Sequence, residues 1–229
     1  MEFIKKNIET LRLRVKEAAE KSGRREEDIK IVAVTKTVMP ETIQVAVDYG
    51  LTILGENRVQ EAQRKIGLVK GDVSWHMIGH LQKNKAKYAV RLFSMIQSVD
   101  SYELAVEIDK RAGKLGKVMD VLVQVNIGKE ETKFGAEYEE TPELIKKISE
   151  LENIRVKGLM AIAPFKEDPE DVRPFFKKMR ELFLKLKDLR LKNVEMEFLS
   201  MGMTHDFHVA IEEGANMIRI GSGIFGPRI

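Results

Sequence analysis

A lysine stands at the end of an apolar segment near the start of the chain. Residues 31–35 read Ile-Val-Ala-Val-Thr, the pattern of a buried strand, and Lys36 follows them directly. Burying an ammonium group is costly unless it is paired, reaches solvent or shifts its pKa. A lysine desolvated in this way is the nucleophile of Schiff-base chemistry. Lys36 is therefore a candidate for such chemistry; the alternatives are a side chain that reaches solvent and an ion pair with Glu56.

Two glycine-containing segments near the end of the chain have the composition of a phosphate site. Residues 200–204 read Ser-Met-Gly-Met-Thr, and residues 221–226 read Gly-Ser-Gly-Ile-Phe-Gly. Glycines let backbone N–H groups approach an anion, and serine or threonine hydroxyls complete its shell. The candidate phosphate-loop residues are Ser200, Met201, Gly202, Thr204, Gly221 and Ser222. A simple tight turn is the alternative for the second segment, because Gly-Ser-Gly triplets are common.

An arginine interrupts the last apolar segment, residues 217–220, which reads Met-Ile-Arg-Ile. A guanidinium group has five N–H donors and no acceptor, so a buried Arg219 needs an acceptor beside it. A structural salt bridge is one interpretation. The ring nitrogen of a pyridine cofactor is the other.

Two histidine pairs have spacings that resemble those of metal ligands. His76 and His80 are four residues apart, and His205 and His208 are three apart. The first spacing needs a helix to bring both side chains together. His76 lies in an expected strand, where residues i and i+4 are roughly 13 Å apart. With no third ligand in view, we expect no metal site.

Eight short apolar segments follow a first helix expected at about residues 3–22. The expected strands are residues 31–35, 52–54, 75–78, 95–99, 121–125, 158–162, 197–199 and 217–220. Several are apolar throughout, which is typical of parallel strands buried on both faces. Helices are expected between them at residues 40–49, 101–112, 142–151 and 169–189, each of which opens with proline or serine.

Strand alternating with helix eight times predicts a (β/α)8 barrel. A doubly wound open sheet usually carries a glycine-rich turn after its first strand, where residues 34–37 read Val-Thr-Lys-Thr. We predict a single α/β domain over residues 1–229, a (β/α)8 TIM barrel with an extra N-terminal helix. In such barrels the carboxyl ends of the strands face the active site. This rule selects Lys36, Glu56, Asn57, His80, Asn126 and the segments 200–204 and 219–222.

Composition excludes several classes of function. The absence of cysteine excludes disulfides, thiolate metal sites and cysteine nucleophiles. The 39 basic and 36 acidic residues are interleaved and form no basic stripe of the kind that nucleic-acid binding requires. No apolar run is long enough to span a bilayer, and the first residues lack a signal-peptide pattern. We expect a cytoplasmic protein, a monomer, that binds neither nucleic acid nor membrane.

The ordered set of motifs is more specific than any one of them. It comprises Lys36, Glu56-Asn57, Gly-His-Leu-Gln at residues 79–82 and the segments 200–204 and 219–226. Over almost the whole chain this set strongly resembles the pyridoxal phosphate homeostasis proteins, called YggS in bacteria and PROSC in animals. These proteins are similar to the barrel domain of alanine racemase standing alone.

The resemblance implies that pyridoxal 5′-phosphate (PLP) is held as a Schiff base on Lys36 and that Arg219 faces the pyridine nitrogen. It further implies that Asn57 lies near the ring and that His80 lines the mouth of the pocket. The residues implied to surround the phosphate are Ser200, Thr204, Gly221 and Ser222, and Met201 and Gly202 lie in the loop between Ser200 and Thr204. Thr204 stands where relatives often carry serine, and Ser222 where they often carry threonine, so the hydroxyl is kept in both places.

Three functions are compatible with this expectation. The resemblance implies a non-catalytic carrier that stores PLP and passes it to apo forms of PLP-dependent enzymes. A racemase of the alanine racemase type needs a second base opposite Lys36, a tyrosine from a second subunit with an extra β-domain. The chain ends at Ile229, and none of its four tyrosines is expected at a strand end. His80 could replace that tyrosine. A class I aldolase is the third possibility, although its lysine is not usually on the first strand.

Arg219 bears on the choice among these functions. A permanently charged donor cannot accept a hydrogen bond from a protonated pyridine nitrogen, so the ring stays unprotonated and is a poorer electron sink. Transamination and decarboxylation depend on that sink and are not expected. We therefore predict a protein that is not an enzyme, with at most trace racemase activity.

Overall fold

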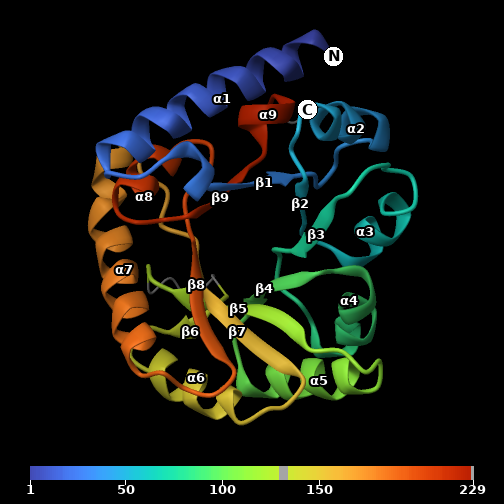
Figure 1. Ribbon diagram of the computed structural model, residues 1–229, viewed down its shortest axis with the longest axis vertical. Coiled ribbons are helices and arrows are strands. Elements are labelled where there is room, and N and C mark those ends of the chain that lie inside the picture. Colours follow the sequence, from blue (N-terminus) through green and yellow to red (C-terminus); the bar gives the residue numbers. More distant parts are fainter. Residues whose placement is uncertain (129–133, 228–229) are drawn as a thin grey trace.

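Eight parallel strands close into a barrel in the computed structural model, which describes residues 1–128 and 134–227 (Figure 1). The strands are β1 (Lys30–Val34), β2 (Ile53–Glu56), β3 (Ser74–Met77), β4 (Met95–Val99), β5 (Met119–Asn126), β7 (Ile154–Ala161), β8 (Val194–Ser200) and β9 (Met217–Ile220). Each pairs with the next in this order, and β9 pairs with β1. The predicted barrel and its eight strands are confirmed.

The barrel strands are apolar throughout because both of their faces are buried. One face lines a small core inside the barrel, formed by Val32, Val34, Ile78, Met95, Leu122, Met160 and Met217. The alternate residues, such as Ala33 and Ile96, belong to the larger core between strands and helices. Successive side chains of a strand point to opposite faces. The interior residues are therefore even-numbered in β1 and β3 and odd-numbered in β4 and β9.

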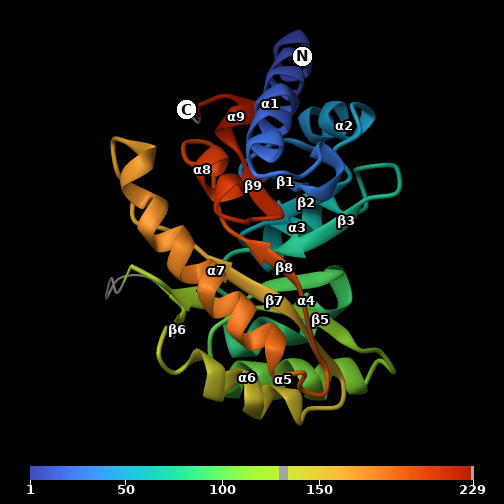
Figure 2. The same ribbon diagram turned by 60° about the vertical axis from the view of Figure 1, so that its left-hand side comes forward.

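Helices cover the outside of the barrel. Their bounds are α1 (Glu2–Lys21), α2 (Pro40–Asp48), α3 (Val59–Lys65), α4 (Ala86–Leu92), α5 (Tyr102–Gly113), α6 (Thr141–Ser149), α7 (Arg173–Asp188), α8 (Phe207–Glu212) and α9 (Ser222–Phe225). The extra N-terminal helix α1 packs against α8 and α9, as Figures 1 and 2 show. It buries Ile4, Ile8, Leu11 and Val15, which share one face of the helix.

The structure departs from the expected elements in several places: α3, α4, α8 and α9 were not among the expected helices, and β7 and β8 begin earlier than expected, at Ile154 and Val194. The helix expected at residues 169–189 begins as a short 3-10 helix, Pro169–Val172, and continues as α7. Pro174 lies in the first turn of α7 and has no N–H to bond the carbonyl of the preceding turn, so the helix restarts there. A short strand, β6 (Ala136–Glu137), pairs with the end of β5. Two residues are too few to show a periodic pattern.

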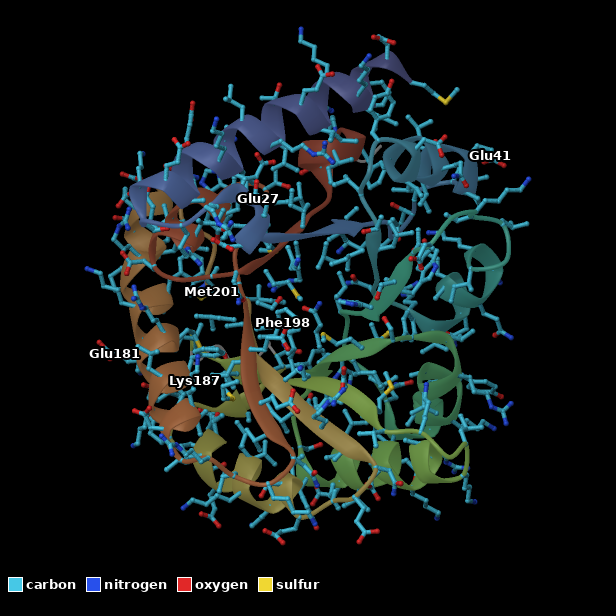
Figure 3. All side chains as sticks on the ribbon, viewed as in Figure 1. Glu27, Glu41, Glu181, Lys187, Phe198 and Met201 are labelled. Atoms are coloured by element: carbon cyan, nitrogen blue, oxygen red, sulfur yellow. The ribbon has the colours of Figure 1, made fainter. Side chains whose placement is uncertain are left out.

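The side chains follow this layering. In Figure 3, Glu181 extends outward from α7, whereas Phe198 and Met201 lie within the ribbon, and Met201 is fully buried. Within residues 1–128 and 134–227, no helix combines the length and the apolarity needed to cross a membrane.

Candidate functional site

Side chains alternate between the two faces of each strand, and this alternation brings the predicted site residues to one end of the barrel interior. In β1 the interior residues are Val32 and Val34, and a further step of two reaches Lys36, half-buried in the turn after the strand. The same step leads from Ile78, directly after β3, to His80, and from Arg219 on β9 to Gly221. The carboxyl ends of the strands thus direct these residues toward the mouth of the barrel.

Strand register places Lys36 between two other candidates. Val34 pairs with Gly55 of β2, two residues before Asn57. On the other side, Val32 pairs with Arg219 of β9, two residues before Gly221. Gly79 supports the close approach of the next loop, because a Cβ there would lie 2.4 Å from the Asn57 carbonyl oxygen.

The two loops predicted to hold a phosphate lie against each other. The Thr204 Oγ1 accepts a hydrogen bond from the Gly223 N–H at 3.2 Å and one from the Ser222 hydroxyl at 3.4 Å. The backbone N–H of Arg219 donates to the Gly202 carbonyl at 3.0 Å. Gly202 has φ +91°, and a Cβ there would lie 2.6 Å from the Ala210 Cβ. Two hydroxyls and a glycine turn therefore share one place at the barrel mouth.

Arg219 is a buried cation without a carboxylate beside it. Its guanidinium donates to the Ser200 Oγ and to the Ala161 carbonyl, both at 2.8 Å, so these bonds use two of its five N–H donors. In the described part of the chain no carboxylate lies within 4 Å of it, so no direct salt bridge forms, and the charged group that acts on it from farther away is Asp206. Burial lowers the pKa of Arg219 to about 10 while the charge of the more distant Asp206 raises it, so the group stays cationic at neutral pH.

Ser200 begins a chain of hydrogen bonds through the barrel interior. Its hydroxyl donates to Gln97 Oε1 at 2.7 Å, and the Gln97 amide nitrogen lies 2.9 Å from His76 Nδ1. The other ring nitrogen of His76 lies 3.3 Å from the Ser74 hydroxyl. Burial lowers the pKa of His76 to about 4, so the ring is neutral at pH 7 and its Nδ1 accepts from Gln97. We call Arg219, Ser200, Gln97 and His76 the interior chain.

Sequence reasoning missed Gln97 and placed Ser200 among the phosphate residues. Ser200 is fully buried, and the interior chain supplies both an acceptor for its hydroxyl hydrogen and a donor to its oxygen. A phosphate contact at this hydroxyl would replace one of these partners. His76, considered above only as a metal ligand, is held by Gln97 and Ser74. Within the described residues, no group of three acidic or histidine side chains could hold a metal ion.

A second polar group lies outside the barrel, under α3. The Lys65 ammonium donates to the Thr35 carbonyl at 2.7 Å, to Glu56 Oε1 at 2.8 Å and to Glu61 Oε1 at 2.6 Å. Glu56, proposed above as an ion-pair partner of Lys36, is thus bound to Lys65. Burial raises the pKa of Glu56 even though Lys65 and Thr35 donate to it. Burial would also raise the pKa of Glu61, but hydrogen bonds from Lys65 and the Thr37 N–H lower it overall.

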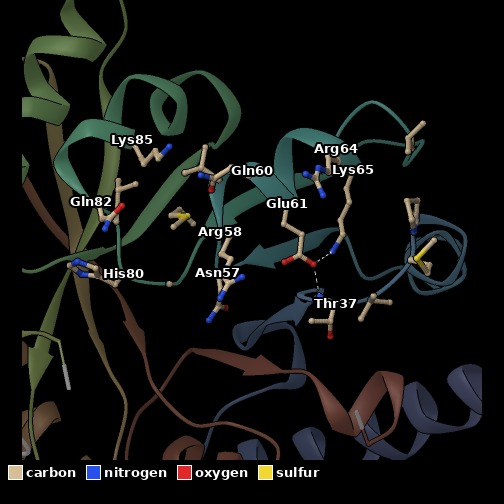
Figure 4. A pocket seen from close by; sticks show the side chains of 18 of the residues that line it. Thr37, Asn57, Arg58, Gln60, Glu61, Arg64, Lys65, His80, Gln82 and Lys85 are labelled. Atoms are coloured by element: carbon tan, nitrogen blue, oxygen red, sulfur yellow. Dashed lines mark hydrogen bonds and ion pairs between the residues drawn. The ribbon is translucent and has the colours of Figure 1, made fainter. Parts of the chain in front are cut away.

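An open groove of about 1160 Å³ adjoins this cluster (Figure 4). Its walls include Thr37 from the turn after β1, Asn57 from the turn after β2 and His80 from the loop after β3. His80 Nδ1 lies 3.3 Å from Asp100 Oδ2, and its ring stacks on Phe134 with centroids 3.7 Å apart. The groove therefore opens beside the turn that carries Lys36.

The gathered residues fit a phosphorylated pyridine aldehyde. Lys36 supplies an amine, the Ser222 and Thr204 hydroxyls lie together on the glycine loops, and Arg219 has donors beyond its two protein bonds. A pyridine nitrogen is an acceptor when unprotonated, which matches a donor-only group. This chemistry of amine, hydroxyls and guanidinium agrees with the group that the motifs imply.

Comparisons with known proteins agree with this geometry. The model of the alanine racemase N-terminal domain family matches residues 6–228. The chain is 50% identical over 216 residues to the pyridoxal phosphate homeostasis protein of Aquifex aeolicus, covering 94% of each chain. Among solved structures, PipY of Synechococcus elongatus with PLP bound has a TM-score of 0.85 at 32% identity, with 97% of this chain and 100% of PipY covered. An alanine racemase of Clostridium difficile, 19% identical with a TM-score of 0.76, shares the fold over 56% of its length and 100% of this chain.

Proposed function

The chain belongs to the alanine racemase N-terminal domain family and, within it, to the pyridoxal phosphate homeostasis proteins, and we propose that it binds PLP and serves its intracellular homeostasis. The observation that supports the proposal is the pairing of neighbouring strands β1 and β9, in which Val32 pairs with Arg219, so the turn after β1 that carries Lys36 and the glycine turn after β9 follow adjacent strands at the same end of the barrel. Arg219 there is a buried cation with unused donors and no carboxylate within 4 Å among the described residues.

Each part of the site has a role in holding the cofactor. Lys36 would carry it covalently, the Thr204 and Ser222 hydroxyls with Gly221 would hold the phosphate, and Arg219 would donate to the ring nitrogen. Asn57 would lie beside the ring and His80 at the mouth. The cofactor, when bound, supplies an aldehyde that forms a Schiff base with an amine and a ring that can withdraw electrons.

The same residues support a carrier over an enzyme. Arg219 cannot accept a proton from the ring nitrogen, and this limits how strongly the ring withdraws electrons. A racemase also needs an acid or base on each side of the substrate carbon. No tyrosine is among the described residues that line the groove, and the Tyr138 hydroxyl donates instead to the Lys178 carbonyl on the outside of the barrel. We propose that the protein stores PLP and releases it to apo-enzymes, with at most trace racemase activity; a cytoplasmic location and a monomeric state remain predictions.

The covalent site is tested by spectroscopy and mass mapping. The purified protein mixed with PLP should show visible absorption, and borohydride reduction should attach the cofactor to the peptide that contains Lys36. Lys36→Ala should lose both signals. Label on Lys85, which lines the groove, would contradict the assignment, and the absence of visible absorption from the wild type would favour an aldolase.

A further inference from the structure

The two residues that flank Lys36 are both held from outside the barrel. The Thr35 carbonyl accepts from Lys65 at 2.7 Å, and the Thr35 hydroxyl donates to Glu56 Oε1 at 2.7 Å. On the other side of Lys36, the Thr37 N–H donates to Glu61 Oε1. Figure 4 shows the Glu61 carboxylate between the Lys65 ammonium and the backbone of Thr37. The turn that carries Lys36 is therefore tied to α3 at both ends.

Lys65 joins these contacts into one cluster. Its three N–H donors meet three acceptors: the Thr35 carbonyl, Glu56 Oε1 and Glu61 Oε1. Thr35 and Glu56 are fully buried, and 8% of the Lys65 side chain is exposed. Charge-assisted hydrogen bonds in such a place are among the strongest in proteins. The cluster, which we call the outer clamp, comprises Thr35, Glu56, Glu61 and Lys65.

The outer clamp also explains an unfavourable backbone conformation. Thr37 has φ +64°, in the left-handed region that a β-branched residue rarely adopts. Such a conformation persists where surrounding contacts hold it, and the Glu61 carboxylate holds the Thr37 N–H. The clamp holds Thr35 and Thr37 from the side of α3. Lys36 lies between them and is two residues beyond Val34, so we expect it to face the barrel interior, as Val32 and Val34 do.

We propose that Lys65 is a positioning residue for Lys36. Through Glu56 and Glu61 it holds the turn after β1 in the conformation that presents the Lys36 amine at the barrel mouth. The inference rests on the proposed function, in which Lys36 carries PLP. Lys65 does not touch the cofactor; it acts through the backbone on both sides of Lys36.

The chain offers a matched control on two other strands of the barrel, β7 and β8. Lys157 of β7 is also nearly buried, with 12% of its side chain exposed, and it also binds two carboxylates, Glu195 and Glu197. Lys157 is the fourth residue of β7, and Glu195 and Glu197 are the second and fourth residues of β8, so none of them lies at the turn after β1. Lys65→Met and Lys157→Met therefore each remove one doubly paired lysine, and only the first should affect the turn.

Two readouts separate positioning from general stability. Hydrogen exchange of the peptide covering residues 35–39, measured without PLP, reports the turn itself. Titration with PLP, followed by borohydride reduction and mass mapping, reports how much cofactor is attached to Lys36. Lys65→Met should speed exchange of this peptide and weaken PLP binding, each by about tenfold or more, the effect of losing buried charge-assisted hydrogen bonds. Lys157→Met should stay within about twofold of wild type in both, because its contacts are remote from Lys36.

A milder pair of variants covers the case in which Lys65→Met does not fold. Glu61 is partly exposed, with 24% of its side chain accessible, so Glu61→Ala removes the Thr37 contact at less cost to the core. It should also speed exchange and weaken binding, and Glu61→Gln, which keeps an acceptor, should recover most of both. Unchanged exchange at residues 35–39 in Glu61→Ala, or equal losses in Lys65→Met and Lys157→Met, would overturn the inference. Failure of the wild type to bind PLP would instead overturn the proposed function.

Discussion

Two polar systems border the mouth of the barrel, and they balance charge in different ways. The outer clamp places one ammonium in direct contact with two carboxylates, so each charged group has an oppositely charged partner within the protein. The interior chain contains the Arg219 guanidinium, but the partners given by the structure are a hydroxyl and a carbonyl, which are neutral. The Lys65 ammonium uses all three of its donors within the clamp, and of the Glu56 oxygens only the buried Oε2 has no hydrogen-bond partner among the described residues. The interior chain keeps a cation and spare donors for an acceptor from outside.

This difference assigns the two systems different roles. A buried ion cluster whose members satisfy one another fixes a backbone and is costly to interrupt. A buried cation whose hydrogen-bond partners are neutral can interact strongly with a bound ligand, because water does not screen its charge there. The clamp would then set the position of Lys36, and the interior chain would set the electronic environment of what Lys36 holds.

The largest expected effect is on stability, from breaking the outer clamp at its most buried member. Glu56→Ala removes one of the two carboxylates that bind the Lys65 ammonium and leaves a cavity beside it. Removing one partner of a buried ion pair should lower the free energy of unfolding of the apoprotein by about 4 kcal/mol. Urea unfolding measures this change. Glu195→Ala, which removes a half-exposed carboxylate bound to Lys157, should cost below about 1 kcal/mol, and equal losses in the two variants would contradict the distinction.

The interior chain should show its effect as a dependence of stability on pH. The pKa of His76 falls from 6.5 to about 4 on burial, so between these values the unfolded state binds a proton that the folded state does not. The stability that comes from neutral His76 is complete above pH 6.5 and is lost as the pH falls toward 4, by up to about 3 kcal/mol.

His76→Gln removes this titrating group and keeps polar atoms near Gln97. The difference in unfolding free energy between wild type and variant should therefore shrink as the pH falls from 7 to 4. A difference that stays constant over this range would show that burial does not shift the pKa of His76.

The smallest expected effects separate the phosphate loops from the ring contact. Ser222→Ala removes a hydroxyl that bonds Thr204 and should weaken PLP retention by about tenfold, with little change in the absorption spectrum. Arg219→Glu should shift the absorption and its pH dependence more than it weakens retention, because a carboxylate can accept from a protonated ring nitrogen. Spectra recorded during PLP titration test both variants. An unchanged Arg219→Glu spectrum would count against a contact with the ring.

The sequence allowed the barrel and most of the mouth to be predicted because both depend on local patterns. Strands buried on two faces are continuous apolar runs, and residues that follow such a run must lie at the carboxyl end of the barrel. Lys36 and Arg219 were recognisable as charges next to or within these runs. The strand β6 has no such run and was missed.

The outer clamp and the interior chain depend on contacts that local patterns do not encode. Lys65 and Glu61 have the i, i+4 spacing of an ordinary surface pair, and nothing in that spacing indicates that α3 packs over β2 and buries Lys65 against Glu56. A signal for the interior chain was present. His76 and Gln97 are polar residues at interior positions of apolar strands, where the alternation of β3 and β4 directs them toward Ser200.

We propose that this protein carries PLP and does not turn over amino acids at the rate of a dedicated enzyme. The most direct test combines two assays on one preparation of PLP-loaded protein: exchange of the α-proton of L- and D-alanine with solvent, and reactivation of an apo-aminotransferase compared with an equal amount of free PLP. The account predicts exchange far below ordinary enzyme rates, because each missing proton-transfer group costs on the order of a hundredfold or more, together with clear reactivation. Fast exchange, with no reactivation beyond that given by free PLP, would contradict the carrier and establish a racemase.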